Sequence, residues 1–456
     1  MTRVCEHVPA GHGFIERFTG AGVESELLCE ACAANGAAAT LDANDELVAR
    51  VRDARVRFEG APQVIELASE LALELHDVEI ACPALTDLKP FGAGDRSRWL
   101  GLTADGRVVE LDLDRREARE LARVAIPAPL ELHVSSRGEF VAVVAKHGTR
   151  GEIVELATDR RIAVDRAGYH EDVCRFPFAF VAHRGRDVAI FAPEWNRLAA
   201  FDLRTGEALT ARPTPASGDR HYIDYFHCGL DVSPGGTMIA DNGWVWQPLG
   251  VIATWNLERW LDDNVWESED GLSRRDLDWR EDWDVPLCWL DDTRLAIAGH
   301  GDMDRSFPTA IDIVDARTGK LVRWFAGPDA AELAFDRVLF SLGEATTVWD
   351  VERGGGLLRS PHRFARYHAG AKQFAALPSE GRIAIGTLRG LDANAAWATD
   401  RVRAVAASID DPEAQLGILG DALDDAGCTD DELLAHCRKP GPHGRHCWAL
   451  DRLARR

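Results

Sequence analysis

The chain has 456 residues, and its content of 46% hydrophobic and 28% charged residues is ordinary for a globular protein with a substantial core. A formal net charge of −23, with no basic run in the sequence, argues against nucleic acid as a partner because its phosphates would be repelled. The sequence shows no apolar stretch behind a basic start, and no apolar run approaches the roughly 20 residues of a membrane-spanning helix. We therefore expect a cytoplasmic protein that binds neither nucleic acid nor a membrane.

Residues 1–60 carry two closely spaced pairs of metal-binding residue types. Cys5 and His7 form a Cys-x-His pair, and Cys29 and Cys32 form a Cys-x-x-Cys pair. Side chains two positions apart on a strand point to one side, and a Cys-x-x-Cys turn directs both sulfurs at one centre. These four ligands predict one structural zinc ion, and their spacing resembles that of zinc-ribbon and treble-clef fingers. A redox Cys-x-x-Cys pair with an unrelated cysteine and histidine nearby is the alternative.

The next segment is expected to lead into a second domain. Residues 42–58 have the apolar spacing of a helix, with Leu47, Val48 and Val51 on one face. We expect residues 63–75 to be extended, with a helix over their alanines and leucines as the alternative.

From residue 61 to residue 391 the sequence repeats one phrase: an apolar strand, a polar turn and a second apolar strand. Residues 132–145 are the clearest copy. A third strand then ends in an Asp-x-x-Thr-Gly hairpin turn, as in residues 198–206 and 310–319, and residues 320–325 form a fourth strand. The copies are anchored at Trp99, Phe140, Val188, Met238, Leu295, Val338 and Ile383, with steps of 41, 48, 50, 57, 43 and 45 residues.

Seven four-stranded units of about 40–50 residues predict a mainly β chain built on a seven-bladed β-propeller over residues 61–391. The units resemble those of WD40-like and YVTN-like propellers, although only Trp349-Asp350 is a good match to the Trp-Asp hallmark of WD40 repeats. The resemblance implies the fold and no particular partner. Because the seventh unit is short, we expect a strand from residues 63–75 to complete it and leave no open sheet edge.

The longest step contains eight of the 14 tryptophans of the chain, between residues 244 and 289, interleaved with acidic residues. Tryptophan is enriched as an anchor at binding surfaces, and neighbouring carboxylates favour a cationic ligand, of which a basic protein segment is the natural candidate. Packing of a long hairpin against the propeller is the alternative, and it is favoured for Trp244, Trp246, Trp255 and Trp289. The candidate partner-binding residues are Trp266, Trp279, Trp283, Asp278 and Asp282.

Residues 392–456 carry dense helix signals and predict a short α-helical module. Pro412 follows Asp411 at the first turn of one helix, and Gly427 is expected to end it. Residues 418–428 and 436–448 resemble a C-terminal module of uncharacterised planctomycete proteins, which implies an accessory module and no reaction. A second zinc site would use His436, Cys437, His443 and Cys447; because their spacing fits no standard finger, a packed turn between helices is favoured.

Two functions are compatible with this organisation. The first is a non-catalytic protein-interaction scaffold with a rigid propeller, accessory modules at both ends and a tryptophan-rich acidic contact. The sequence contains no Gly-x-Ser-x-Gly, P-loop or His-Glu-x-x-His motif, which favours this hypothesis. The alternative is a metal-dependent hydrolase or lyase with a site in the propeller channel, for which the candidates are His221, His227, His300 and Asp302.

Overall fold

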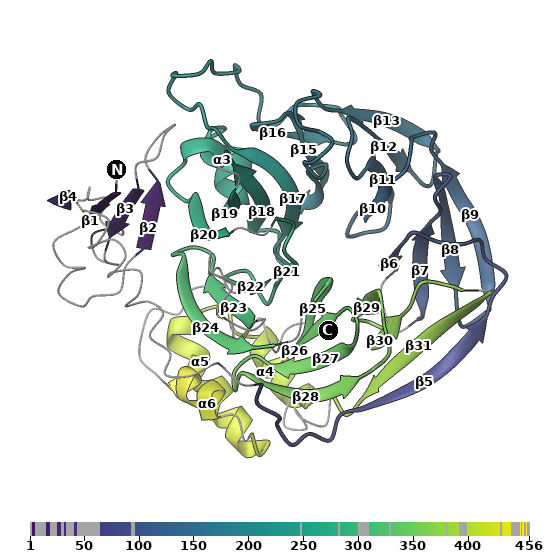
Figure 1. Ribbon diagram of the computed structural model, residues 1–456. Coiled ribbons are helices and arrows are strands. Elements are labelled where there is room, and N and C mark those ends of the chain that lie inside the picture. The colour runs from purple at the N-terminus through teal and green to yellow at the C-terminus, as the bar shows by residue number, and fades with distance from the viewer. Residues whose placement is uncertain are drawn as a thin grey trace.

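A computed structural model describes residues 64–92, 96–246, 249–280, 283–299, 310–327, 330–379, 381–391, 399–428 and 431–438, with four short strands and a few single residues nearer the two ends. Seven sheets form a ring, and the first strands of successive sheets contact one another around its axis (Figure 1). The predicted seven-bladed β-propeller is confirmed.

Six blades follow chain order, with the first strand innermost and all neighbours antiparallel. Blades 1 to 3 comprise β6 (Asp87–Pro90), β7 (Arg98–Leu102), β8 (Arg107–Asp112) and β9 (Glu117–Arg123); β10 (Leu130–Val134), β11 (Phe140–Ala145), β12 (Arg150–Glu155) and β13 (Arg160–Asp165); and β14 (Phe178–His183), β15 (Arg186–Glu194) and β16 (Arg197–Asp202). Blades 4 to 6 comprise β17 (Phe226–Val232), β18 (Met238–Val245), β19 (Leu249–Asn256) and β20 (Arg275–Arg280); β21 (Leu287–Trp289), β22 (Arg294–Ala298), β23 (Ala310–Asp315) and β24 (Lys320–Ala326); and β25 (Glu332–Asp336), β26 (Val338–Leu342), β27 (Thr346–Asp350) and β28 (Gly355–Ser360).

The seventh blade joins the two ends of the ring. It contains β29 (Arg366–His368), β30 (Gln373–Ala375) and β31 (Arg382–Arg389), and its outer strand is β5 (Ala72–Glu79), which pairs antiparallel with β31 along its whole length. The predicted closure of the ring by the chain before the first unit is therefore confirmed, although the closing strand shares only residues 72–75 with the expected segment 63–75.

The seventh copy of the repeated phrase is one strand out of register. Residues 374–385 span the second and third strands of their blade, whereas residues 132–145 span the first and second strands of theirs. The cause is β29, which has three residues, two of them Arg366 and His368, and so lacks the apolar pattern of an inner strand.

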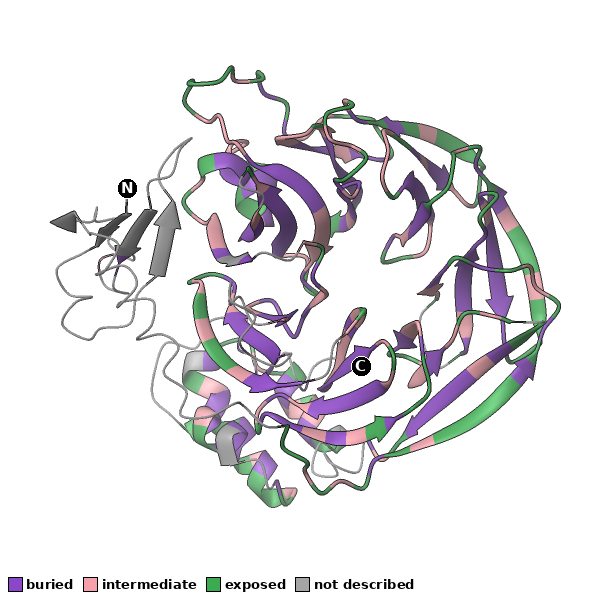
Figure 2. Ribbon diagram, viewed as in Figure 1, coloured by how far each residue is buried: buried purple, intermediate pink, exposed green. Residues whose placement is uncertain are grey.

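The core of the propeller lies between blades, because each sheet is covered on both sides by its neighbours (Figure 2). In β11, Val141 and Val143 pack toward blade 1, whereas Ala142 and Val144 pack toward blade 3. Alternate residues of a strand point to opposite sides, so a strand between two blades is apolar throughout. Each buried valine contributes about 1.5–3 kcal/mol. The outer strand β9 is mostly exposed.

The predicted Asp-x-x-Thr-Gly turns join third to fourth strands, where both are present. In blade 5 the Oδ1 atom of Asp315 accepts the backbone N–H groups of Arg317 and Thr318 at 3.0 Å each. Gly319, with φ of +71°, then donates to the Asp315 carbonyl at 2.8 Å. The aspartate thus replaces the missing backbone partners of a tight turn, and glycine takes the left-handed conformation.

Blade 3 has three strands rather than the expected four among the residues described. The chain after β16 returns along its edge through one bridge, Phe201 to Ala208, and a hydrogen bond from Leu209 N–H to the Ala200 carbonyl at 2.8 Å. The guanidinium of Arg212 then covers the Leu198 carbonyl at 3.0 Å. Pro213, which has no N–H group, follows immediately, so a regular strand does not continue.

Residues 257–274 form the insertion in blade 4. It contains a five-residue π-helix, η1 (Arg259–Asp263), and a short helix, α3 (Glu267–Asp270). Glu269 and Arg212 form an ion pair in which both side chains are at most 2% exposed. This pair joins the insertion to the edge of blade 3.

Short elements flank the propeller. Near the N-terminus β1 (Thr2–Val4), β2 (Ile15–Phe18), β3 (Ser25–Leu28) and β4 (Leu41–Asp42) form one sheet in the order β2-β3-β1-β4. The helix predicted over residues 42–58 lies outside the described residues, apart from Asp42, which is in a strand.

The C-terminal region is helical, as expected. It contains α4 (Asp400–Ala407), α5 (Pro412–Asp425) and α6 (Asp431–Arg438). The side chain of Asp411 caps α5 by accepting the Ala414 N–H, and Gly427 adopts φ of +74° just after its end. None of the helices described combines the length and hydropathy needed to cross a membrane.

Candidate functional site

One face of the ring gathers both the starts of the inner strands and several turns. Because strands alternate in direction within a blade, the turn between second and third strands emerges on the face where the inner strand begins. The segment linking one blade to the next emerges there too. We call this the entry face; the turns between third and fourth strands lie on the opposite face.

Charged side chains at the starts of the inner strands link neighbouring blades. Arg366 contacts Asp87 at 2.9 Å and Glu332 at 3.1 Å, which connects blades 7, 1 and 6. The second oxygen of Asp87 accepts the N–H of Leu132 in blade 2 at 3.1 Å. These contacts tie the ring together around its axis, on the entry face.

Arg175 and Glu131 form a second pair near the axis of the ring. The Arg175 Nε atom donates to Glu131 Oε2 at 2.9 Å, and its other nitrogen donates to Oε1. Burial alone would raise the pKa of Glu131, but the charge of Arg175 and its hydrogen bonds hold that pKa well below the usual range. Glu131 is therefore ionised and its charge is neutralised by Arg175.

Two titratable groups further along the inner strands are shifted toward their neutral forms. Burial, with a contribution from Glu332, raises the pKa of Asp231 to about 7, and Lys89 only partly opposes this. Burial lowers the pKa of His133 to about 4. Among the residues described, no lysine or arginine forms an ion pair with Asp231.

A cluster of aromatic rings occupies the entry face over blades 3 and 4. We call it the aromatic surface. Phe226 stacks on Trp244 with ring centroids 3.8 Å apart, and Trp244 stacks on Trp283 at 4.9 Å. Trp195 contacts Phe226 at 4.3 Å. The remaining members are Tyr169, His170 and Trp246, which contact Phe226 or Trp244 at 5.4 to 6.2 Å.

The rim of the aromatic surface is open to solvent. Tyr169, Val173 and Trp246 are 44%, 43% and 46% exposed, whereas Trp244 beneath them is 3% exposed. These three are among the few large apolar side chains that the described chain exposes, and two of them lie in the segment between blades 2 and 3. Exposed apolar side chains that gather in one place indicate a contact site.

Acidic residues flank the members of the aromatic surface in the sequence. Asp172 and Asp284 are exposed, and Glu171 and Asp224 are half-buried. The nearby Arg166 does not offset them at the surface, because its buried guanidinium is turned inward and donates to the carbonyls of Gly148, Glu171, Cys174 and Arg175 at 2.6 to 3.3 Å.

The structure separates the predicted partner-binding residues. Trp283 belongs to the aromatic surface on the entry face. Trp266 follows η1 in the insertion on the opposite face, where it stacks on His221 at 4.3 Å and contacts the guanidinium of Arg212 at 5.4 Å. In the sequence, β20 lies between these two tryptophans and carries Asp278 and Trp279, of which the structure describes only the backbone. Asp282 is outside the described residues.

Trp246 differs from the expectation that it packs inside the fold. Trp244, Trp255 and Trp289 are at most 5% exposed, as expected. Trp246 shares the strand parity of Trp244, but β18 ends at Val245, so Trp246 stands in the turn and is released from the core.

The histidines proposed for a catalytic site make separate contacts. His221 Nδ1 lies 2.7 Å from Asp270 Oδ1 beside the insertion. His227 is 1% exposed, and its Nδ1 atom bonds to the buried carboxylate of Asp241. His300 and Asp302 lie outside the described residues. Within the described part of the chain, no three potential metal ligands gather at one point.

The predicted zinc ligands are only partly described. Cys5, His7 and Cys29 lie outside the described residues, and Cys32 is half-buried. In the C-terminal region, His436 Nε2 lies 3.1 Å from the sulfur of Cys447, and Cys437 is 3% exposed in the same core, whereas His443 lies outside the described residues.

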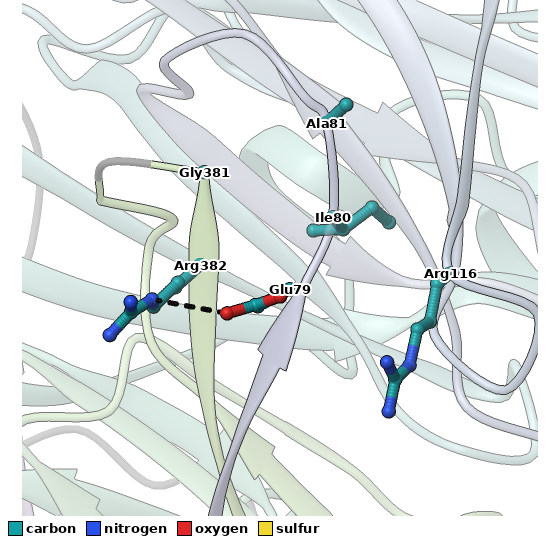
Figure 3. A pocket seen from close by; sticks show the side chains of 6 residues that line it. All are labelled: Glu79, Ile80, Ala81, Arg116, Gly381 and Arg382. Carbon is teal, nitrogen blue, oxygen red and sulfur yellow. Dashed lines mark ion pairs between the residues drawn. The ribbon is translucent and has the colours of Figure 1, made fainter.

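A shallow hollow of about 430 Å³ lies where blades 7 and 1 meet, lined by Glu79, Ile80, Ala81, Arg116, Gly381 and Arg382 (Figure 3). Glu79 points toward Arg382, with 3.9 Å between their charged atoms, and away from Arg116. Both side chains of the pair are more than half exposed, so this hollow does not bring functional groups together as closely as the aromatic surface does.

The fold thus defines a seven-bladed β-propeller, which is consistent with the resemblance to WD40-like propellers. Comparison with models of known protein families finds no match, and comparison with curated proteins finds none either.

Proposed function

We propose that this protein is a non-catalytic interaction scaffold whose aromatic surface binds a basic segment of a partner protein. The observation that carries the proposal is the exposure of Tyr169, Val173 and Trp246 at one site on the entry face, above the stacked and buried rings of Phe226 and Trp244. Turns and links held by a rigid ring are a common location for such contacts.

The chemistry of the aromatic surface favours a cationic partner. The faces of tryptophan and tyrosine attract guanidinium and ammonium groups, with about 0.5–1 kcal/mol at exposed sites and about 2 kcal/mol where water is excluded. The neighbouring carboxylates of Asp172 and Asp284 and the net charge of −23 act in the same direction.

The flanking regions support the role of a scaffold. We propose that Cys5, His7, Cys29 and Cys32 hold one structural zinc ion. The strands β1 and β3 are paired in parallel, so their carboxyl ends lie together, and Cys5 and Cys29 are the next residues in the sequence. A complete set of four ligands stabilises a small fold and leaves no coordination position for a substrate.

The buried Cys174, Cys228 and Cys288 of the propeller are thiols rather than disulfides, which supports a cytoplasmic location.

The proposal is tested with fluorescent peptides of equal length, one rich in arginine and lysine and one rich in glutamate. We expect the full-length protein to bind the basic peptide, and Trp246→Ala to weaken it about tenfold, which corresponds to about 1.4 kcal/mol. Leu272→Ala is the matched control, because this side chain is 78% exposed in the insertion on the opposite face.

Equal effects of the two substitutions would show that binding depends on net charge alone and would refute the site. Point substitutions are preferable to deletion of residues 262–284, because that segment contains the buried Glu269 and the strand β20.

A further inference from the structure

Two cysteines from neighbouring blades meet beneath the aromatic surface. Cys174 lies in the segment that enters blade 3, and Cys228 lies on β17, the inner strand of blade 4. Both are 2% exposed and belong to one cluster with Phe226 and Trp244. Cys174 directly follows Val173, whose side chain is 43% exposed, so the chain reaches the surface one residue before this thiol.

The surroundings of the two sulfurs are unequal. The sulfur of Cys174 accepts a hydrogen bond from Trp244 Nε1 at 3.2 Å. The Cys228 sulfur also lies 3.7 Å from the carbonyl of Phe226. The two thiols thus belong to one buried cluster and interact with each other, in a site built from blades 3 and 4.

The electrostatics give the two thiols different roles. Interaction with the neighbouring Cys228 lowers the pKa of Cys174, against the effect of burial, and Trp244 and the charge of Arg166 add to the lowering. Burial raises the pKa of Cys228 well above its usual value. A thiolate is the reactive form of cysteine, so Cys174 is the nucleophile of the pair and Cys228 its resolving partner.

We infer that Cys174 and Cys228 form a reversible disulfide beneath the aromatic surface. With hydrogen peroxide as the oxidant, the Cys174 thiolate attacks one peroxide oxygen, the O–O bond breaks, and a sulfenic acid and hydroxide result, the latter taking a proton to become water. The Cys228 sulfur then attacks the sulfenic sulfur, the S–O bond breaks, and its thiol proton leaves with the hydroxyl group as a second water. Two electrons pass from the sulfurs to the peroxide, and a dithiol reductant reverses the step.

The disulfide would fasten the segment that carries Tyr169, His170 and Val173 to the inner strand of blade 4. The closed loop from residue 174 to residue 228 encloses all of blade 3. A covalent link of this length restricts the unfolded chain, so the oxidised protein should resist denaturation more than the reduced protein. This inference stands independently of the proposed partner.

The test uses the folded full-length protein, first reduced with dithiothreitol, then freed of it and treated with hydrogen peroxide. Remaining thiols are alkylated before digestion under non-reducing conditions. Mass spectrometry should detect one dominant cross-linked pair of peptides containing Cys174 and Cys228, lighter by two hydrogen atoms than the separate peptides and lost on renewed reduction. The urea midpoint should rise on oxidation.

Cys174→Ser and Cys228→Ser should each abolish this cross-link and the rise in midpoint, whereas Cys82→Ser, which replaces a half-buried cysteine elsewhere, should preserve both. The inference is overturned if both cysteines are recovered alkylated under conditions that oxidise Cys82. It is also overturned if Cys174 advances to sulfinic acid without a cross-link to Cys228.

Discussion

Replacing Asp231 by asparagine is expected to stabilise the protein at neutral pH. Asp231 lies on the inner strand β17, is half-buried, and is influenced by the charges of Glu332, Lys89 and Arg175. Burial and the neighbouring Glu332 oppose its negative charge, and Lys89 compensates only in part. Asparagine has nearly the same shape, keeps an oxygen that can accept the Val232 N–H, and carries no charge to desolvate.

The magnitude follows from the pKa of Asp231, which rises from 3.8 to about 7 on folding. Each pH unit of difference corresponds to about 1.4 kcal/mol, so full burial would cost about 4 kcal/mol, and partial exposure reduces this to about 2 kcal/mol. Because the folded-state pKa is raised, the native protein is favoured below pH 3.8, where the carboxyl is protonated in both states. As the pH rises from 3.8 toward 7, the unfolded state ionises first and the free energy of unfolding falls. Above pH 7 the carboxyl is ionised in both states, and this group causes no further change with pH.

The assay is urea denaturation of the full-length protein and of Asp231→Asn at pH 5 and pH 8. The variant should gain about 2 kcal/mol over the natural protein at pH 8 and less at pH 5. Asp172→Asn, at an exposed position, should show the same difference at both pH values. A stability change for Asp231→Asn that is equal at pH 5 and pH 8, or a loss at pH 8, would refute the reasoning.

Three further outcomes follow from the described contacts. Glu269→Gln should destabilise the protein by about 3–5 kcal/mol in urea denaturation, because it leaves the buried charge of the Arg212 guanidinium without a counter-charge, and adding Arg212→Met should restore part of the loss. Gly386→Ala on β31 should lower the free energy of unfolding by about 1–3 kcal/mol in the same assay, because the added Cβ would lie 2.8 Å from Phe364 and 2.9 Å from Leu73. His133, with a pKa of about 4, should remain neutral at pH 5.5 in an NMR titration; its neutral burial favours the native state above pH 6.5, and this contribution is lost as the pH falls toward 4.

The repeated fold was predictable because its signals are local. Strands between two blades are apolar throughout, and turns such as Asp315 to Gly319 can be recognised from five consecutive residues. The prediction failed by one strand in blade 7, where β29 carries Arg366 and His368 for contacts around the axis instead of apolar residues for a core. It also missed the irregular edge of blade 3, which depends on the long-range contact between Arg212 and Glu269.

The aromatic surface was largely hidden in the sequence because its members come from five separate segments. Tyr169, Trp195, Phe226, Trp246 and Trp283 become neighbours only when blades 3 and 4 stand side by side. Nearness in sequence instead grouped Trp266 with Trp283, although a strand carries the chain across the ring between them. The sequence nevertheless indicated which tryptophans share a face, because the position of a turn within its blade determines the face of the ring on which that turn lies.

The pairing of β5 with β31 affects how the chain folds during its synthesis on the ribosome. Glu79 pairs with Arg382, so β5 has no partner strand until 303 further residues have been synthesised. This takes roughly 15 to 60 s at about 5–20 residues per second. An unpaired strand edge in that interval invites association with other nascent chains. Glu74, Asp77 and Glu79 place three negative charges along β5. These charges keep the unpaired edge of β5 hydrated until β31 has been synthesised.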